Sequence, residues 1–184
     1  MPSSESATEV VINPESQLLS DARSFALFFF FALLDETMAV DAAERAISAW
    51  KASANSAASG SGKTPAGNRA QFVRLCKRRI DAERALQRSE RKRGATGREE
   101  RIGASAPGGD GSSWKVSDAD TMAAWIRFAR EASDDEVNAL ILTRVLKIDE
   151  NDVAIGLATS IGALRNRIGR AARALGAAAK AQAS

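Results

Sequence analysis

Residues 133–176 read SDDEVNALILTRVLKIDENDVAIGLATSIGALRNRIGRAARALG, and this segment carries the clearest structural pattern in the chain. Its apolar residues recur at helical spacing, and Ser or Asp stands where each helix would begin. The pattern predicts helices over 134–146, 150–157 and 161–175. Between the last two helices lie residues 158–160, which is the turn length of a helix-turn-helix.

The predicted helix starts carry capping residues. Ser133 and Glu136 have the spacing of a capping box, and Asp149 precedes the next helix. Ser160 is positioned to cap the last helix, which we expect Gly176 to end.

The last predicted helix carries unpaired positive charge. Residues 153–184 contain five basic residues and no acid, whereas a solvated helix usually mixes charge signs. The apolar stripe of this helix comprises Leu164, Ile168 and Leu175. Four polar residues fall away from that stripe, toward a DNA groove and its phosphates: Arg165, Asn166, Arg170 and Arg173. Arg167, nearer the flank, is suited to a phosphate or to an acid within the domain, and a plain solvated face is the alternative interpretation.

The composition excludes several functional classes. The chain has 184 residues, 45% of them apolar and 27% charged, as in soluble globular proteins. It has one cysteine and no histidine, which argues against a disulfide, a zinc site and a histidine-based catalytic triad. We therefore expect no enzyme, no metal, no cofactor and no small-molecule substrate. The first fifteen residues carry acids and no base, so we expect no signal peptide and a cytoplasmic protein.

The most apolar segment is FALFFFFALL, residues 25–34. It is shorter than the roughly 20 residues that span a bilayer, so we expect a buried helix and no membrane insertion. Four consecutive phenylalanines cannot share one helix face, which leaves core packing, the favoured interpretation, and partner contact both open.

Charge alternates in blocks along the chain. Residues 1–68 contain 4 basic and 8 acidic residues, and residues 69–101 contain 12 basic and 5 acidic ones. Residues 102–143 contain 3 basic and 7 acidic residues, and residues 144–184 contain 7 basic and 3 acidic ones. The two basic blocks can bind a polyanion at two places.

The predicted fold class is all-α: two small helical domains joined by a flexible linker, the second containing the helix-turn-helix. No stretch alternates with a period of two for long enough to suggest a strand. In the first domain we expect helices from Asn13 to Leu34, over 37–51 and over 68–93. In the second domain we expect a helix over 118–131, followed by the helices over 134–146, 150–157 and 161–175. The apolar side of the 68–93 helix comprises Phe72, Leu75, Ile80 and Leu86. The expected organisation is a disordered N-terminus over 1–12, a helical domain over 13–93 with an internal loop at 53–68, a linker over 94–114, a second domain over 115–178 and a tail over 179–184.

The segment from Asp152 to Leu175, DVAIGLATSIGALRNRIGRAARAL, resembles the promoter-reading region of extracytoplasmic-function sigma factors. The family pattern there is E-I-A-E-x-L-G followed by I-S-x-G-T-V-K-S-R-L-x-R-A-R-x-x-L. Residues 39–50, AVDAAERAISAW, are similar to the family's polymerase-binding helix, and 68–93 occupies the place of its downstream-element helix. The family's turn glycine is Ala158 here, its isoleucine is Thr159, and Gly169 is an added helix breaker.

The resemblance implies a transcription initiation factor whose partners are promoter DNA, core RNA polymerase and an anti-sigma protein. It implies polymerase contacts at Asp41, Glu44 and Trp50. The DNA contacts that it implies on the last helix are Ser160, Gly162, Ala163, Arg165, Asn166, Arg167, Arg170 and Arg173; those on the 68–93 helix are Arg74, Arg78 and Arg79. Two alternatives stay open: a helix-turn-helix regulator that does not act through polymerase, and a sigma-mimicking protein interaction module.

Two further motifs carry little weight. AASGSGKT, residues 57–64, approximates a P-loop, but no strand precedes it and Pro65 follows it. Cys76 is flanked by Lys77, Arg78 and Arg79, which allows a lowered thiol pKa, although a small buried residue is the commoner role.

Overall fold

The computed structural model describes residues 14–58, 65–94 and 119–181, with side chains over 18–53, 69–89 and 121–181. All regular structure in these ranges is helical, as predicted. In chain order the elements are α1 (Pro14–Leu33), α2 (Glu36–Ala58), α3 (Pro65–Gly94), α4 (Ala119–Glu131), α5 (Asp134–Leu140), a π-helical turn η1 (Ile141–Val145), α6 (Glu150–Gly156) and α7 (Ile161–Lys180).

Helices α1, α2 and α3 pack together around aromatic side chains. Phe25 stacks on Phe72 with ring centroids 4.3 Å apart, and Trp50 meets both rings edge-on at 6.0 Å. These three residues, called the aromatic cluster below, come from the three helices in turn. The Trp50 indole N–H donates to the buried Asp21 carboxylate at 3.1 Å, so the polar atom within this core is satisfied.

The consecutive phenylalanines of α1 pack into the hydrophobic core. Phe25, Phe28 and Phe29 are fully buried, and Phe30 and Phe31 are half-buried against the same core. Neighbouring helices therefore surround α1 on several sides, which explains how consecutive aromatic residues are accommodated. Core packing was the favoured interpretation of this segment and is confirmed.

Two predictions for the first three helices were wrong. Helix α2 continues to Ala58 and α3 begins at Pro65, so helix occupies part of the loop predicted at 53–68. The residues concerned, mostly Ala and Ser, are compatible with helix when a preceding turn is in place. Leu86 was expected on the apolar side of α3 but is half exposed.

Helices α4–α7 form a second group whose starts follow the predicted caps. The Glu136 carboxylate accepts from the Ser133 backbone N–H at 3.1 Å and from its hydroxyl at 2.8 Å. Asp149 accepts from the backbone N–H of Asn151 at 2.8 Å, and Ser160 accepts from that of Ala163 at 3.1 Å. Gly176 does not end α7, because the alanine-rich segment after it carries the helix on to Lys180.

Left-handed residues separate the helices. Leu34, Lys147 and Ala158 have φ of 56°, 55° and 51°, each just after a helix has ended. Ala158 therefore holds the left-handed turn position at which the sigma family has glycine, at a cost of about 1 kcal/mol.

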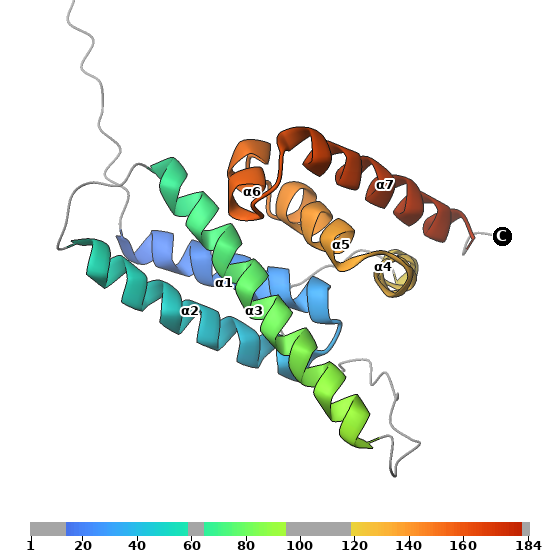
Figure 1. Cartoon of the computed structure of the whole chain (residues 1–184), viewed down its shortest axis with the longest axis horizontal. Coiled ribbons are helices and arrows are strands. Elements are labelled where there is room, and N and C mark those ends of the chain that lie inside the picture. The colour runs from blue at the N-terminus through green and yellow to red at the C-terminus, as the bar shows by residue number, and fades with distance from the viewer. Residues whose placement is uncertain (1–13, 59–64, 95–118, 182–184) are drawn as a thin grey trace, which may run out of the picture.

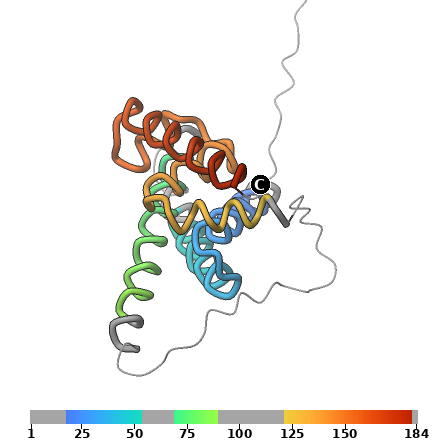
Figure 2. The backbone as a smooth tube through the Cα atoms, turned by 90° about the vertical axis from the view of Figure 1, so that its right-hand side faces the viewer, coloured from blue at the N-terminus to red at the C-terminus, as the bar shows by residue number. Residues whose placement is uncertain are grey.

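The two groups of helices lie against each other and share one hydrophobic core (Figure 1). Helix α6 packs against α3, and η1 touches α1. The Trp125 indole N–H of α4 donates to the Phe31 backbone carbonyl at 3.0 Å, and their rings meet edge-on. Helix α3 runs along one side of the molecule, beside both groups of helices (Figure 2). The domain limits remain a prediction, and Asn13 and almost all of the 94–114 linker lie outside the described residues.

Two features are absent from the described residues, a membrane span and a metal site. None of these helices is long and apolar enough to cross a membrane. Within the same ranges, no group of His, Cys, Asp and Glu is arranged to hold a metal ion.

Candidate nucleic-acid interface

Helix α7 places its charged residues opposite a buried stripe. Leu164, Ile168 and Ala171 are buried, and the stripe continues to Ala178. Leu175, predicted in the stripe, is half-buried and packs against the core. The candidate residues exposed on the other side are Ser160, Gly162, Arg165, Asn166, Arg170 and Arg173, while Ala163 and Arg167 are partly covered.

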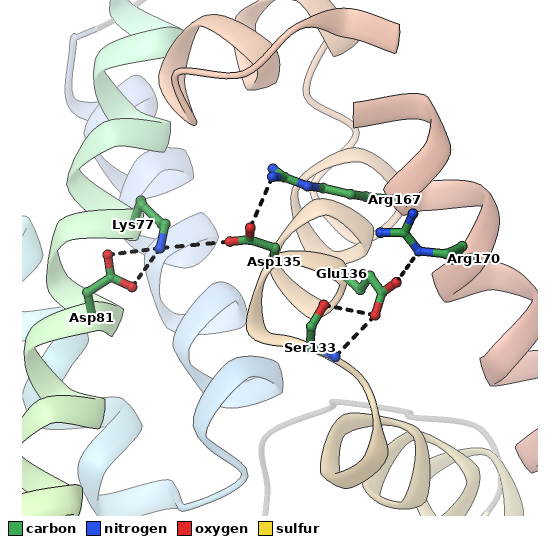
Figure 3. Close-up of polar contacts among 7 residues, drawn as sticks. All are labelled: Lys77, Asp81, Ser133, Asp135, Glu136, Arg167 and Arg170. Carbon is green, nitrogen blue, oxygen red and sulfur yellow. Dashed lines mark hydrogen bonds and ion pairs between the residues drawn. The ribbon is translucent and has the colours of Figure 1, made fainter. Parts of the chain in front are cut away.

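Three arginines of α7 are paired with acids of the same group of helices. Arg165 Nε lies 2.7 Å from Glu150 Oε2, Arg167 Nη2 lies 3.1 Å from Asp135 Oδ2, and Arg170 Nε lies 2.6 Å from Glu136 Oε1. The last two pairs join α7 to the first turn of α5 (Figure 3).

These pairings mean that three of the four arginines of α7 already have an acidic partner within the protein. The Arg170 hydrogen bond, followed by those from Ser133, lowers the pKa of Glu136 below its ordinary value. Of the two roles considered for Arg167, the acid within the protein is the one observed. Asn166 and Arg173 have no hydrogen bond or ion pair to another side chain among residues 121–181, so both are accessible to a ligand without breaking such a contact.

On α3, the predicted DNA-contacting residues differ from one another. Arg74 and Arg78, four residues apart on one face, are exposed, with no ion pair in the described part of the chain. Arg79 is partly covered and pairs with Glu83, a buried carboxylate that Arg45 also contacts at 3.4 Å. Arg79 is thus held within the protein, which argues against its predicted role as a direct phosphate contact.

On α2, two of the three predicted polymerase-binding residues lie at the surface. Asp41 and Glu44 are exposed. Trp50 is only 6% exposed and belongs to the aromatic cluster, so its predicted direct contact with polymerase was wrong. A single tryptophan at helical spacing does not indicate by itself which side of the helix faces the core.

Cys76 is a core residue and not a reactive thiol. It is fully buried, and this burial raises its thiol pKa well above the ordinary value. The neighbouring cations therefore do not produce the reactive thiolate considered from the sequence, because desolvation outweighs them.

The two groups of helices meet along a seam, defined here as the contacts of α3 with α5 and α6. A Cβ added to Gly156 of α6 would lie 2.4 Å from Val73 Cβ and 2.9 Å from the Ala70 carbonyl oxygen of α3. Lys77 Nζ lies 3.9 Å from Asp135 Oδ1, and Arg84 Nη1 lies 3.0 Å from Asp134 Oδ1. Arg84 Nη2 also donates to the Ala32 carbonyl of α1 at 3.2 Å.

The seam was not predicted from the sequence. Gly156 was treated only as part of a family motif, and the acids at the start of α5 only as helix-start residues. The signal was present in the acidic run Asp134–Glu136, since three acids exceed what a helix start needs. Their cationic partners, however, are 32 to 58 residues away in the sequence, so only the fold identifies them.

No family profile and no curated protein matches the chain. The fold is similar to that of a chain in the co-crystal structure of the sigma factor RpoE in complex with the anti-sigma factor NepR from Bartonella quintana, with a TM-score of 0.69. The two chains are 16% identical, and the similarity covers 90% of this chain and 96% of the other. At that identity, the likeness shows the fold alone, which is the all-helical fold of that sigma factor.

Proposed function

We propose that this chain is a sigma-factor-like transcription initiation protein that binds core RNA polymerase and directs it to promoter DNA. Helix α7 would read the upstream element as the second helix of a helix-turn-helix, and Arg74 and Arg78 of α3 would meet the downstream element. Asp41 and Glu44 of α2 would contact polymerase. An anti-sigma protein is a proposed further partner.

The observation that carries this proposal is the construction of α6, the turn and α7. Ser160 caps α7, Ala158 adopts the left-handed turn, and the buried stripe directs Arg165, Asn166 and Arg173 outward. Arg and Asn are the side chains that pair bidentately with guanine and adenine in the major groove. The structural likeness to a sigma factor, which covers 90% of the chain, supports the same proposal.

The test is reconstitution with core RNA polymerase on a library of promoter fragments. We expect promoter-dependent transcripts from the wild-type chain and a loss of at least about tenfold in the Asn166→Ala/Arg173→Ala variant, because each bidentate base contact contributes about 1–3 kcal/mol. Arg127→Ala/Arg130→Ala on α4 is the control, since it also removes exposed arginines and leaves α7 intact. Equal transcription from both variants would overturn the assignment of α7.

The sigma-mimicking interaction module remains the second candidate, and one observation favours it. Three of the four α7 arginines contact acids of the protein, as a surface that does not meet phosphate would. In the same reconstitution, a mimic gives neither transcripts nor DNA retention but forms a stable complex with an anti-sigma protein. DNA retention without transcripts supports the regulator that does not act through polymerase.

A further inference from the structure

We propose that Glu150 and Glu136 are positioning residues, each of which fixes an arginine of α7 so that its guanidinium group is presented to a guanine in the major groove. The two arginines are Arg165 and Arg170. This inference rests on the proposed function, because it names the bases that α7 would read. Its supports are the atoms through which each arginine is held, the exposure of the guanidinium groups and the charge of the pairs.

Arg165 and Arg170 are both held through Nε and not through their terminal nitrogens. Arg165 Nε donates to Glu150 Oε2 at 2.7 Å. Arg170 Nε donates to Glu136 Oε1 at 2.6 Å (Figure 3). In neither arginine does an Nη atom donate a hydrogen bond within the described part of the chain. Because the guanidinium group is rigid and planar, a bond at Nε fixes the direction of the edge formed by Nη1 and Nη2, called the terminal edge below, without occupying it.

Arg167 shows the opposite arrangement on the same helix. It contacts Asp135 through the terminal atom Nη2 at 3.1 Å, and its side chain is only 26% exposed. The side chains of Arg165 and Arg170 are 65% and 56% exposed. The pair at Arg167 therefore uses the terminal edge inside the protein, whereas the other two pairs leave it accessible to a ligand.

The two arginines are placed to reach different base pairs. They stand five residues apart on α7, which is about 7.5 Å along the helix axis and corresponds to about two base-pair steps. They also lie about 140° apart around the axis, with the exposed Asn166 and Arg173 between them. One tethered arginine thus lies on each side of the exposed face of α7.

Each acid also changes what its arginine binds best. A carboxylate beside a guanidinium group offsets much of its charge, so the pair attracts a phosphate less than a lone arginine does. A guanine edge is uncharged and offers two acceptors, O6 and N7, that match the terminal edge. Arg173, which has no ion pair among the described residues, keeps its full charge for phosphate. The pairing therefore favours guanine over the DNA backbone at Arg165 and Arg170.

The test identifies the guanines that the full-length chain reads. The wild-type chain, alone and with core RNA polymerase, is used to select from a randomised library of DNA duplexes. Each guanine of a selected duplex is then replaced in turn by 7-deazaguanine, which pairs normally with cytosine but lacks the N7 acceptor. Discrimination at a position is the dissociation constant of the replaced duplex divided by that of the parent duplex. We expect two positions with discrimination of at least about fivefold, the lower limit for a bidentate base contact.

Three arginine variants assign these positions. Arg165→Ala and Arg170→Ala should each abolish discrimination at one position and leave the other unchanged, and both side chains are exposed, so the fold should tolerate the changes. Arg167→Ala should leave discrimination at both positions as in the wild type. Retention of both positions by Arg165→Ala and by Arg170→Ala would overturn the inference.

The decisive variant is Glu150→Ala, with Glu131→Ala as its control. Both remove an acid that holds the Nε atom of an exposed arginine, since Arg127 Nε lies 3.3 Å from Glu131 Oε1 within α4. Both also lose one negative charge, so their general effects on DNA attraction match. Only Glu150→Ala should lower discrimination toward one, and only at the position assigned to Arg165.

Glu150→Gln separates the direction of the arginine from its charge. The amide oxygen restores an acceptor for Arg165 Nε without a negative charge, so discrimination should recover relative to Glu150→Ala. Failure to recover would overturn the role of the Nε bond. Glu136 is less suited to this test because it also belongs to the capping box of α5.

The outcomes separate this inference from the proposed function. Duplex binding that no 7-deazaguanine weakens, or unchanged discrimination in Glu150→Ala, overturns the positioning role and leaves DNA binding standing. An equal loss in Glu131→Ala also overturns it, because the effect would then follow from net charge. Absence of duplex binding and of promoter-dependent transcripts from the wild-type chain overturns the proposed function, and this inference with it.

Discussion

The aromatic cluster and the seam both bring distant parts of the chain together, but they do so with different chemistry. The cluster joins α1, α2 and α3 through three large rings, and its polar atom, the Trp50 N–H, has a partner. The seam joins α3 to α5 and α6 through ion pairs and a backbone approach, and the buried amide of Asn138 on α5 has no hydrogen-bond partner among the described residues. A core of the first kind is costly to open, whereas contacts of the second kind can be exchanged for water or another ligand.

Phe72→Ala should give the largest effect, because it removes the ring at the centre of the aromatic cluster. We expect a loss of about 3–5 kcal/mol in the free energy of unfolding, measured by urea denaturation. Leu86→Ala on the same helix is the control and should cost no more than about 0.5 kcal/mol, since Leu86 is half exposed. Similar losses from the two variants would remove the distinction between core and surface on α3.

Asn138→Leu should stabilise the protein, which would be the opposite of a typical core substitution. The change keeps the approximate volume and removes two buried polar atoms without partners, so we expect a gain of about 1–3 kcal/mol in the free energy of unfolding. Asn151→Leu, at an exposed position of α6, is the control. A loss of stability in Asn138→Leu would mean that the Asn138 side-chain amide forms hydrogen bonds in the folded protein.

Glu136 predicts a pH dependence for the contact between α5 and α7. Its pKa is lowered in the folded protein, so its contribution is present above about pH 4.3, the ordinary glutamate value, and is lost as pH falls through the lower folded value. Wild type should exceed Glu136→Gln by up to about 1 kcal/mol at neutral pH, the range of exposed ion pairs. Urea titrations of both proteins over acid pH check this, and a constant difference would exclude the Glu136 charge as its cause.

Cys76 should show no reaction at all in the native state. Burial raises its pKa, so a thiol reagent at mildly alkaline pH should modify it only as fast as the protein unfolds. Adding Phe72→Ala should accelerate the reaction, whereas Leu86→Ala should not, because Leu86 is half exposed and lies outside the core. Equal acceleration by both variants would show that Cys76 is exposed by a motion that does not depend on the aromatic cluster.

Local features were the part of this structure that residue patterns predicted well. Ser133, Asp149 and Ser160 all stand at helix starts, and the stripe of α7 is buried at Leu164 and Ile168 as its spacing required. Errors arose where local preference was weak. Ala and Ser near residue 53 tolerate helix and loop alike, and Gly176 is tolerated within a helix that continues on either side.

The candidate site was harder to predict, because the sequence does not show which charged side chains form ion pairs within the folded protein. Arg74 and Arg167 look equivalent as residues of basic helices, yet Arg74 is exposed and Arg167 contacts Asp135. Trp50 was misassigned for a similar reason, since its helix has a core side that only the packing of α1 and α3 defines.

Residue patterns alone were enough to predict that this chain is helical, where most of its helices begin, and that its positive charge gathers on two of them. Those properties depend on hydrogen bonds and apolar contacts between residues a few positions apart. The packing of the helices was needed to show which arginines contact acids, that α3 packs closely against Gly156, and which aromatic residues of α1 are buried. These depend on contacts between residues far apart in the chain, which exist only when the whole set of helices has packed.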